Sequence, residues 1–348
     1  MNAVVFDRLN HLQFCEDYPM PVCRPGWAVV KVMSAGICAT DLEILKGAFG
    51  QPPCVIGHEI CGIVTEAAPD VTACRVGDRV VVETAVSCGH CAHCQSGNKH
   101  LCEGCIEVGF PQIDGGYAQY VACPAGCLHK IPENMSYDEG GILEACLCPF
   151  GLIYRNGMHL DETVLIQGAG VAGLSFLQSV KLFSPRKVLV AVRRSSAEKL
   201  AYRFGADVVI NTAREDLFLR VAEETGGLGV TLSIDAAGAK TTIENAVKLT
   251  AKGGRCILYG LPNRQTQIDF PVTDIILKQL TILGGTNNQL AWDPLIRYVA
   301  AGKFNVKDMV SQTFLLQEHE TALQTVRTRP EGFLKAVFHP WSDRKENL

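Results

Sequence analysis

Four cysteines in one short run restrict the fold of this chain more than any other feature. Cys88, Cys91, Cys94 and Cys102 stand in CGHCAHCQSGNKHLC, with the spacing C-x2-C-x2-C-x7-C. Thiolates at this spacing can surround one Zn²⁺ tetrahedrally from a single loop. The run therefore predicts a closed structural zinc site in a lobe covering about residues 85–105. The alternative for the same thiols is a redox switch.

The size and composition of the chain indicate a globular protein of two domains. Its 348 residues exceed the roughly 250–300 at which single cores stop growing, and 47% are hydrophobic and 20% charged. A net charge of −4 gives no basic surface, and no apolar run reaches the ~18 residues of a membrane span. We therefore expect no nucleic acid and no membrane as partner. The 16 cysteines, without a signal peptide, predict reduced thiols in the cytoplasm.

The pattern of short apolar runs changes at Glu162. Earlier runs such as WAVVKVMSAG and GHEICGIVTEA are separated by glycine turns and predict a β-rich domain, followed by a helix over 138–158. Later runs such as TVLIQ, KVLVAV and LSIDAAG alternate with amphipathic stretches, which predicts a doubly wound parallel sheet. The segments PLIRYVAAGKF, EHETALQTVRT and GFLKAVFH predict two helices and a strand that rejoin the first domain. We predict an α/β fold with domains at 1–153 plus 287–348 and at 154–286.

A glycine fingerprint predicts a dinucleotide site. Gly168, Gly170 and Gly173 form G-x-G-x-x-G between the strand TVLIQ and a helix that opens with Val171 and Ala172. The glycines allow a tight turn, a close approach of the pyrophosphate and close packing of helix on strand, while the helix N-terminus attracts phosphate. A lone fingerprint is weak, but the flanking strand and helix and the second strand KVLVAV strengthen it.

The end of that second strand decides the choice of cofactor. An acidic residue is expected there when the 2′-hydroxyl of NAD is bound. This chain has Val192, then Arg193, Arg194 and Ser195. Two guanidinium groups suit a 2′-phosphate, so the sequence favours NADP(H) over NAD(H). The alternative is an exposed turn without a binding role.

A second group of metal-type ligands lies upstream of the cysteine run. Cys38 in GICATDLE and His58 in GHE offer a thiolate and an imidazole, which suit a catalytic zinc with one position left open. The third ligand stays open between two carboxylates, Glu59 and Glu144, with two thiols near enough in sequence to compete, Cys146 and Cys148.

Taken together, these motifs resemble the zinc-containing medium-chain dehydrogenase/reductase family over essentially the full chain. The resemblance rests on GICATD, GHEICGIV, GDRV, the cysteine lobe, DGGYAQY, ILEA, GAGVAG and GADVVI, and it is nearest to the polyol, sugar and threonine dehydrogenases. It implies a GroES-like catalytic domain, a Rossmann domain, an active site in the cleft between them and a homodimer or homotetramer. A small-molecule alcohol or ketone would be the substrate, with two zinc ions per chain.

The resemblance also implies roles for individual residues. Cys38, His58 and Glu59 would hold the catalytic zinc, with Glu144 as a direct or water-mediated fourth partner and Asp41 orienting the histidine. Other residues would serve the proton path and the substrate. Thr40 would pass the substrate proton outward, and Glu43 stands where a histidine often ends this relay. Asn287 and Asn288 follow the last strand of the parallel sheet, where they could bind substrate hydroxyls, although such pairs usually serve turns.

These parts predict hydride transfer between a secondary alcohol of a polyol or sugar-type substrate and NADP(H). A threonine-type or simple-alcohol dehydrogenase is the nearest alternative. A metal-free NADPH reductase would lack both the GHE ligands and the cysteine lobe. A non-enzymatic NADPH-binding redox sensor would have no use for an open metal site.

Overall fold

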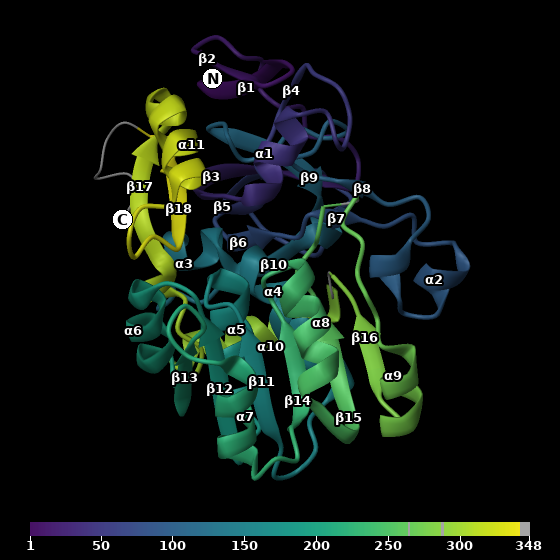
Figure 1. Ribbon diagram of the computed structural model, residues 1–348. Coiled ribbons are helices and arrows are strands. Elements are labelled where there is room, and N and C mark those ends of the chain that lie inside the picture. The colour runs from purple at the N-terminus through teal and green to yellow at the C-terminus, as the bar shows by residue number, and fades with distance from the viewer. Residues whose placement is uncertain (264, 287–288, 342–348) are drawn as a thin grey trace. The chain divides into compact units, whose positions relative to one another are not determined.

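The computed structural model describes residues 1–263, 265–286 and 289–341. The chain divides into two compact units, residues 1–147 with those from 289 onward, and residues 148–288. The predicted α/β fold is confirmed, because a β-rich unit is followed by a unit built on a parallel sheet (Figure 1). Among the described residues, no helix combines the length and apolarity needed to cross a bilayer.

The first unit is built mainly from antiparallel strands. Its largest sheet has the order β10-β6-β5-β3-β18-β17, with β9 also paired to β3, beside smaller sheets β2-β1-β4 and β7-β8. The strands are β1 (Ala3–Arg8), β2 (His11–Cys15), β3 (Trp27–Ile37), β4 (Cys54–Val55), β5 (Glu59–Ala67), β6 (Arg79–Val82), β7 (Ala85–Val86), β8 (Ile106–Glu107), β9 (Tyr120–Pro124), β10 (Leu128–Lys130), β17 (Val310–Leu315) and β18 (Lys335–His339).

Short helices fill the connections of this unit. They are α1 (Ala39–Leu45), α2 (Ala92–Gln95), α3 (Tyr137–Gly141), α10 (Trp292–Ala300) and α11 (His319–Thr328), with 3-10 turns η1 (Lys99–Leu101), η2 (Ala125–Cys127), η3 (Gln289–Ala291), η4 (Lys307–Met309) and η5 (Leu316–Glu318). Helix α4 (Leu143–Asn156) runs from the first unit into the second. The predicted helix over 138–158 is therefore two helices, separated at Ile142.

Strand β18 ties the late part of the chain to the early part. It pairs antiparallel with β3, Ala336 opposite Ile37, and parallel with β17. Phe338 of β18 is fully buried against the ring of Tyr117, with 4.8 Å between ring centroids. Apolar burial thus fixes a late segment beside the early strand β3.

The second unit is a parallel sheet with helices between its strands. Across the described residues the strand order is β13-β12-β11-β14-β15-β16, a doubly wound order that reverses between β11 and β14 (Figure 1). The strands are β11 (Thr163–Gln167), β12 (Lys187–Val192), β13 (Val208–Asn211), β14 (Val230–Asp235), β15 (Thr250–Leu258) and β16 (Thr281–Gly284). The helices are α5 (Val171–Lys181), α6 (Ser195–Arg203), α7 (Leu217–Thr225), α8 (Lys240–Leu249) and α9 (Val272–Lys278).

The amphipathic stretch TTIENAVKLTAKG is helical only as far as Leu249. Thr250 begins β15 and pairs with Val230 of β14, and its hydroxyl donates to the carbonyl of Ala246 at 2.6 Å. A threonine side chain that binds the preceding helical turn competes with the helix backbone, so the chain changes to a strand there.

A buried ion pair joins β15 to the start of β11 in the second unit. The Arg255 guanidinium donates to both carboxylate oxygens of Glu162 at 2.9 Å and to the carbonyl of Gly157 at 3.1 Å. The two side chains are only 12% and 3% exposed. Neither charge has enough water around it to stand alone, so each depends on its partner.

Replacing Glu162 by alanine leaves the Arg255 guanidinium buried without its carboxylate. We expect the free energy of unfolding to fall by about 3–5 kcal/mol, measured by urea unfolding followed by circular dichroism. Arg186→Ala is the control, because its ion pair with Asp161 is exposed and its loss should cost under about 1 kcal/mol. Similar small effects of the two substitutions would contradict this role of Glu162.

Candidate functional site

Three ligand-type side chains of the first unit converge at one end of the β3–β5 pair. Cys38 directly follows β3 and caps α1, while His58 and Glu59 stand at the start of β5. The pairing of Gly36 with Glu59 brings the two segments together. The donor atoms of Cys38, His58 and Glu59 all lie within 4.8 Å of one another.

Asp41 orients this cluster from the first turn of α1. One of its oxygens accepts the backbone N–H of Cys38 at 2.7 Å and the hydroxyl of Tyr117 at 2.6 Å. The other oxygen lies 3.2 Å from Nδ1 of His58, which leaves Nε2 for a ligand. Burial opposes the charged form of Asp41, but the charge of His58 and these hydrogen bonds hold the pKa of Asp41 below its ordinary value.

A lysine far away in the sequence holds Glu59. The Nζ of Lys335 in β18 donates to Oε1 of Glu59 at 2.5 Å, and both side chains are buried. Burial disfavours the ammonium, but the charges of Glu59 and Cys38 outweigh it and raise the pKa of Lys335. The second oxygen of Glu59, Oε2, is buried without a hydrogen-bond partner.

Two further carboxylates belong to the surroundings of the cluster. Burial raises the pKa of Glu144 in α4 to about 7, and the charges of His58 and Glu59 also act on it. Glu107 of β8 interacts with the charge of His58 in the same way. Glu144 was predicted from the sequence, whereas Glu107 and Lys335 were not, because each stands in a segment without any motif.

The remaining residues predicted around this cluster are placed differently. The Thr40 hydroxyl lies 3.5 Å from the sulfur of Cys38. Glu43 is not brought to the cluster, since it is exposed and its carboxylate binds Lys46 at 2.7 Å. Cys146 is buried with its sulfur 3.8 Å from that of Met309, and Cys148 belongs to the second unit. Asn287 and Asn288 lie outside the described residues.

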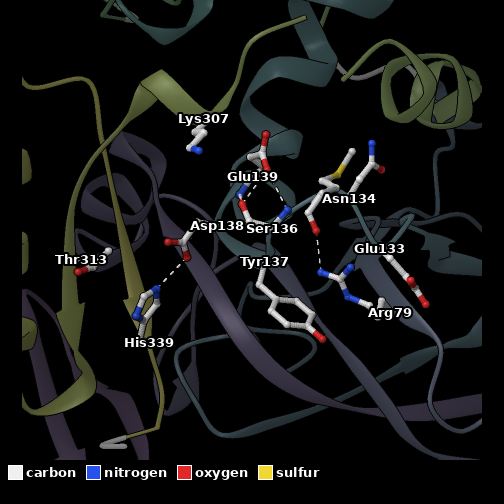
Figure 2. Close-up of a pocket in the computed structure, with 11 residues that line it drawn as sticks. Arg79, Glu133, Asn134, Ser136, Tyr137, Asp138, Glu139, Lys307, Thr313 and His339 are labelled. Atoms are coloured by element: carbon white, nitrogen blue, oxygen red, sulfur yellow. Dashed lines mark hydrogen bonds and ion pairs between the residues drawn. The ribbon is translucent and has the colours of Figure 1, made fainter. Parts of the chain in front are cut away.

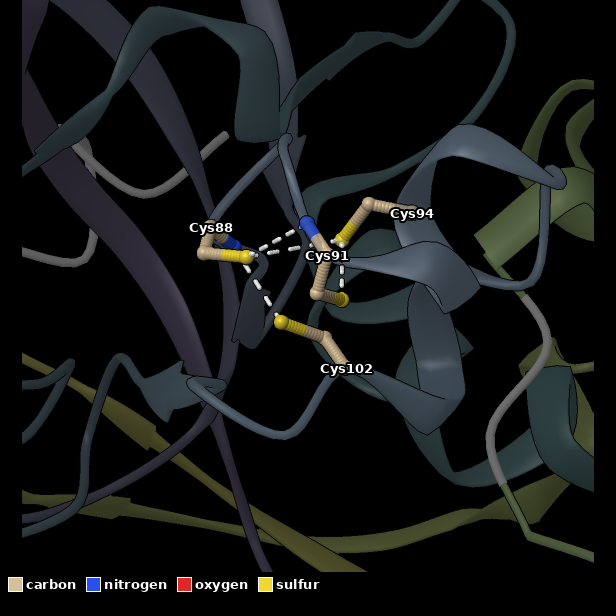
Figure 3. A group of neighbouring side chains, drawn as sticks. All are labelled: Cys88, Cys91, Cys94 and Cys102. Atoms are coloured by element: carbon tan, nitrogen blue, oxygen red, sulfur yellow. Dashed lines mark hydrogen bonds between the residues drawn. The ribbon is translucent and has the colours of Figure 1, made fainter.

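The four cysteines of the lobe turn their sulfurs toward one centre (Figure 3). The sulfur of Cys94 lies 3.9 Å from that of Cys88 and 3.5 Å from that of Cys91. Backbone N–H groups favour two of the thiolates: the N–H of His90 lowers the pKa of Cys88, and that of Cys94 lowers the pKa of Cys91 to about 6. Burial instead raises the pKa of Cys94 to about 11, a shift that a bound cation would oppose.

Both clusters fit zinc by the chemistry of their donors. A tetrahedron with Zn–S bonds of about 2.3 Å places its sulfurs about 3.8 Å apart, near the separations within the lobe. The other cluster offers one thiolate, one imidazole nitrogen and the unpartnered Oε2 of Glu59, a set of three that leaves a fourth position open.

The glycine fingerprint forms the connection from β11 to α5. Gly168 has a φ of +106°, which favours glycine, and a Cβ at Gly173 would stand 1.9 Å from the carbonyl oxygen of Gly168. A Cβ at Gly170 would meet nothing within 4 Å, so open space lies above the turn at the N-terminus of α5. Val171 and Ala172 form the first turn of that helix.

The segment after β12 carries two free cations. Val192 is buried at the end of β12, while Arg193, Arg194 and Ser195 are exposed. Among the residues that the structure describes, the guanidinium group of neither arginine has an ion-pair or hydrogen-bond partner. The nearby acid Glu198 is engaged, since it binds Asn211 and Arg214.

The first unit also has a pocket of about 790 Å³ that contains none of the predicted site residues. Figure 2 shows the His339–Asp138 pair in it. The two atoms lie 2.7 Å apart, and the guanidinium of Arg79 donates to the carbonyl of Met135. Its lining comprises Arg79, Glu133, Asn134, Met135, Ser136, Tyr137, Asp138, Glu139, Lys307, Thr313 and His339.

Comparison with known families matches both units. Residues 24–133 match the alcohol dehydrogenase GroES-like domain, and residues 172–301 match the zinc-binding dehydrogenase domain. The chain is 31% identical to D-arabitol-phosphate dehydrogenase of Enterococcus avium, covering 89% of each chain. It is 33% identical to L-threonine 3-dehydrogenase of Pyrococcus horikoshii, covering 92% of this chain and 93% of the relative.

Solved structures of similar fold include proteins with either nicotinamide cofactor. A zinc-binding dehydrogenase from Sinorhizobium meliloti bound to NADP has a TM-score of 0.90 at 28% identity, and it aligns over 97% of this chain and 99% of its own. An alcohol dehydrogenase from Escherichia coli in complex with NADH has a TM-score of 0.90 at 29% identity over the same shares.

Substituting Asp41 by asparagine tests its role as the organiser of the cluster. An amide cannot accept strongly from both Cys38 and Tyr117, so we expect a loss of about 1–3 kcal/mol in the free energy of unfolding. Tyr117→Phe is the comparison, because it removes one of these hydrogen bonds and leaves the carboxylate. Urea unfolding at one fixed zinc concentration measures both, and a smaller loss for D41N than for Y117F would contradict the assignment.

Proposed function

The chain belongs to the zinc-binding dehydrogenase family, a family of alcohol and polyol dehydrogenases that use NAD(P), and from this premise we propose that it transfers hydride between a secondary alcohol of a polyol or sugar-type substrate and NADP(H). The convergence of Cys38, His58 and Glu59, with a buried carboxylate oxygen still unpartnered, is the observation that carries the proposal.

We assign two zinc ions per chain. The sulfurs of Cys88, Cys91, Cys94 and Cys102 would hold a structural ion, since four thiolates leave no open position. Cys38, His58 and Glu59 would hold the catalytic ion, with Glu144 near it as a fourth partner. That ion, when bound, lowers the pKa of an alcohol hydroxyl and stabilises the alkoxide.

The chain's own residues orient the reactants and move the proton. Asp41 fixes the ring of His58, and Lys335 fixes the carboxylate of Glu59. The hydroxyl of Thr40, beside the sulfur of Cys38, is placed to take the substrate proton and pass it outward. Glu43, exposed and paired with Lys46, stands outside this proposed relay.

For the cofactor, we propose that residues 154–286 form the binding domain and that NADP(H) is preferred. The turn at Gly168, Gly170 and Gly173 would receive the pyrophosphate at the N-terminus of α5. The unpaired guanidinium groups of Arg193 and Arg194, followed by Ser195, support binding of a 2′-phosphate. Val192 brings no carboxylate that would select the 2′-hydroxyl of NAD.

The substrate assignment follows from the polar surroundings of the cluster. Glu144 and Glu59 suit a substrate with several hydroxyl groups, and the names of relatives that act on arabitol phosphate, sorbitol and threonine support such a class. A threonine-type or simple-alcohol dehydrogenase is the alternative. We further propose a homodimer or homotetramer in the cytoplasm, as the family resemblance implies.

Turnover tests the reaction and the cofactor together. We expect zinc-loaded protein to reduce NADP⁺ with a polyol, and Arg193→Ala with Arg194→Ala to lower kcat/KM for NADP⁺ by roughly 10–100-fold while that for NAD⁺ stays within about 3-fold. Lys252→Ala removes an exposed cation of the same unit and is the control. Equal losses with both cofactors would contradict the 2′-phosphate assignment, and absence of turnover across polyols, aldoses, threonine and simple alcohols would contradict the reaction.

Zinc content tests the two metal assignments. We expect about two zinc ions per chain by mass spectrometry of the acid-digested protein, and about one in either Cys38→Ser or Cys94→Ser. Only Cys38→Ser should lose turnover by about 10³-fold or more without loss of fold. Full zinc content and turnover in Cys38→Ser would show that this cluster is not the catalytic site.

A further inference from the structure

The antiparallel pair of β7 and β8 connects the backbone of Glu107 to that of His58. Glu107 pairs with Ala85, and the next residue, Val108, donates its N–H to the carbonyl of Thr84 at 2.9 Å. The hydroxyl of Thr84 in turn donates to the carbonyl of His58 at 3.1 Å. Three successive contacts thus fix the backbone at Glu107 relative to His58.

The residues after Glu107 complete this contact. A Cβ at Gly109 would stand 2.3 Å from the carbonyl oxygen of Gly57, so the backbones touch there. The ring of Phe110 lies 5.2 Å from the ring of His58, centroid to centroid. The loop therefore has little freedom to move Glu107 away from the candidate metal cluster.

The carboxylate of Glu107 is unengaged within the described part of the chain. It is half-buried, and neither a hydrogen bond nor an ion pair among the described residues satisfies it. The contacts of residues 107–110 with Thr84, Gly57 and His58 hold it beside the cluster, where its charge also acts on His58 and Glu144. A half-buried carboxylate without a protein partner is free to accept a hydrogen bond from water or from a donor group of a ligand.

The charges around the cluster restrict that ligand. Glu59 belongs to the cluster and the charges of Glu107 and Glu144 act on its members, while the ammonium of Lys335 is already bound to Glu59. A phosphate group beside the cluster would be repelled by the carboxylate of Glu107. A hydroxyl or ammonium group would instead give Glu107 its missing hydrogen bond.

We propose that Glu107 is a specificity-determining residue of the proposed dehydrogenase site. Its carboxylate binds a hydrogen-bond donor of the substrate beside the reacting carbinol and disfavours phosphorylated polyols. The inference rests on the proposed function. Glu107 selects the substrate and takes no proton in the reaction.

The kinetics of Glu107→Ala and Glu107→Gln test this selection. Propan-2-ol is the reference substrate, because it has no donor besides the reacting hydroxyl. We expect E107A to lower kcat/KM for sorbitol or L-threonine, whichever the wild type oxidises better, by roughly 10–100-fold, mostly through KM, with propan-2-ol within about 3-fold. E107Q distinguishes a hydroxyl donor from an ammonium donor. Its amide oxygen still accepts from a hydroxyl of sorbitol, but it lacks the charge that holds the ammonium of L-threonine. Glu66→Ala, an exposed carboxylate on β5, is the control.

Binding and metal content supply readouts besides turnover. E107A and E107Q should keep the wild-type zinc content. Calorimetry should show that E107Q binds D-arabitol 5-phosphate at least about 3-fold more tightly than the wild type, because the repulsion by the carboxylate is removed. Equal losses on sorbitol, threonine and propan-2-ol, or unchanged binding of the phosphorylated polyol, would overturn the inference. Absence of turnover in the wild type on all three alcohols would instead count against the proposed function.

Discussion

The buried ion pair between Glu59 and Lys335 is the interaction on which the candidate site depends. It joins β5, next to His58, with β18, and so connects an early and a late segment of the first unit. The space around it is tight, because a Cβ at Gly36 would stand 2.0 Å from Oε2 of Glu59. With Oε1 held by Lys335, the glutamate has one oxygen fixed and one left for a ligand. Removing either partner would leave a buried charge unpaired.

The same segments organise the cluster through hydrogen bonds. Asp41 caps the turn at Cys38, receives the hydroxyl of Tyr117 and stands beside His58, so one carboxylate sets the positions of three neighbours. Tyr117 also packs on Phe338 of β18. The apolar core and the polar cluster are therefore connected through the same strand, which explains how the β-rich unit can hold several buried charges.

Much of this could be predicted from the sequence, because motifs with local geometry carry their own structure. The cysteine lobe closes on itself within one loop, so its spacing located it. The glycine turn forms between an adjacent strand and helix, so its spacing and these flanking patterns located it. Family comparison confirmed the fold class and the enzyme class. Lys335 and Glu107 could not be found this way, since their partners come close only through sheet pairing of distant segments. Glu43 lies on the exposed face of α1, where helical spacing turns it away from the cluster.

Diffraction from crystals of the purified protein at the zinc absorption edge is the most direct test of the central claim. The account predicts two anomalous peaks per chain, one among the sulfurs of Cys88, Cys91, Cys94 and Cys102 and one between Cys38, His58 and the free oxygen of Glu59. A single peak in the lobe, with none at Cys38, would contradict an open catalytic zinc site and with it the proposed hydride transfer.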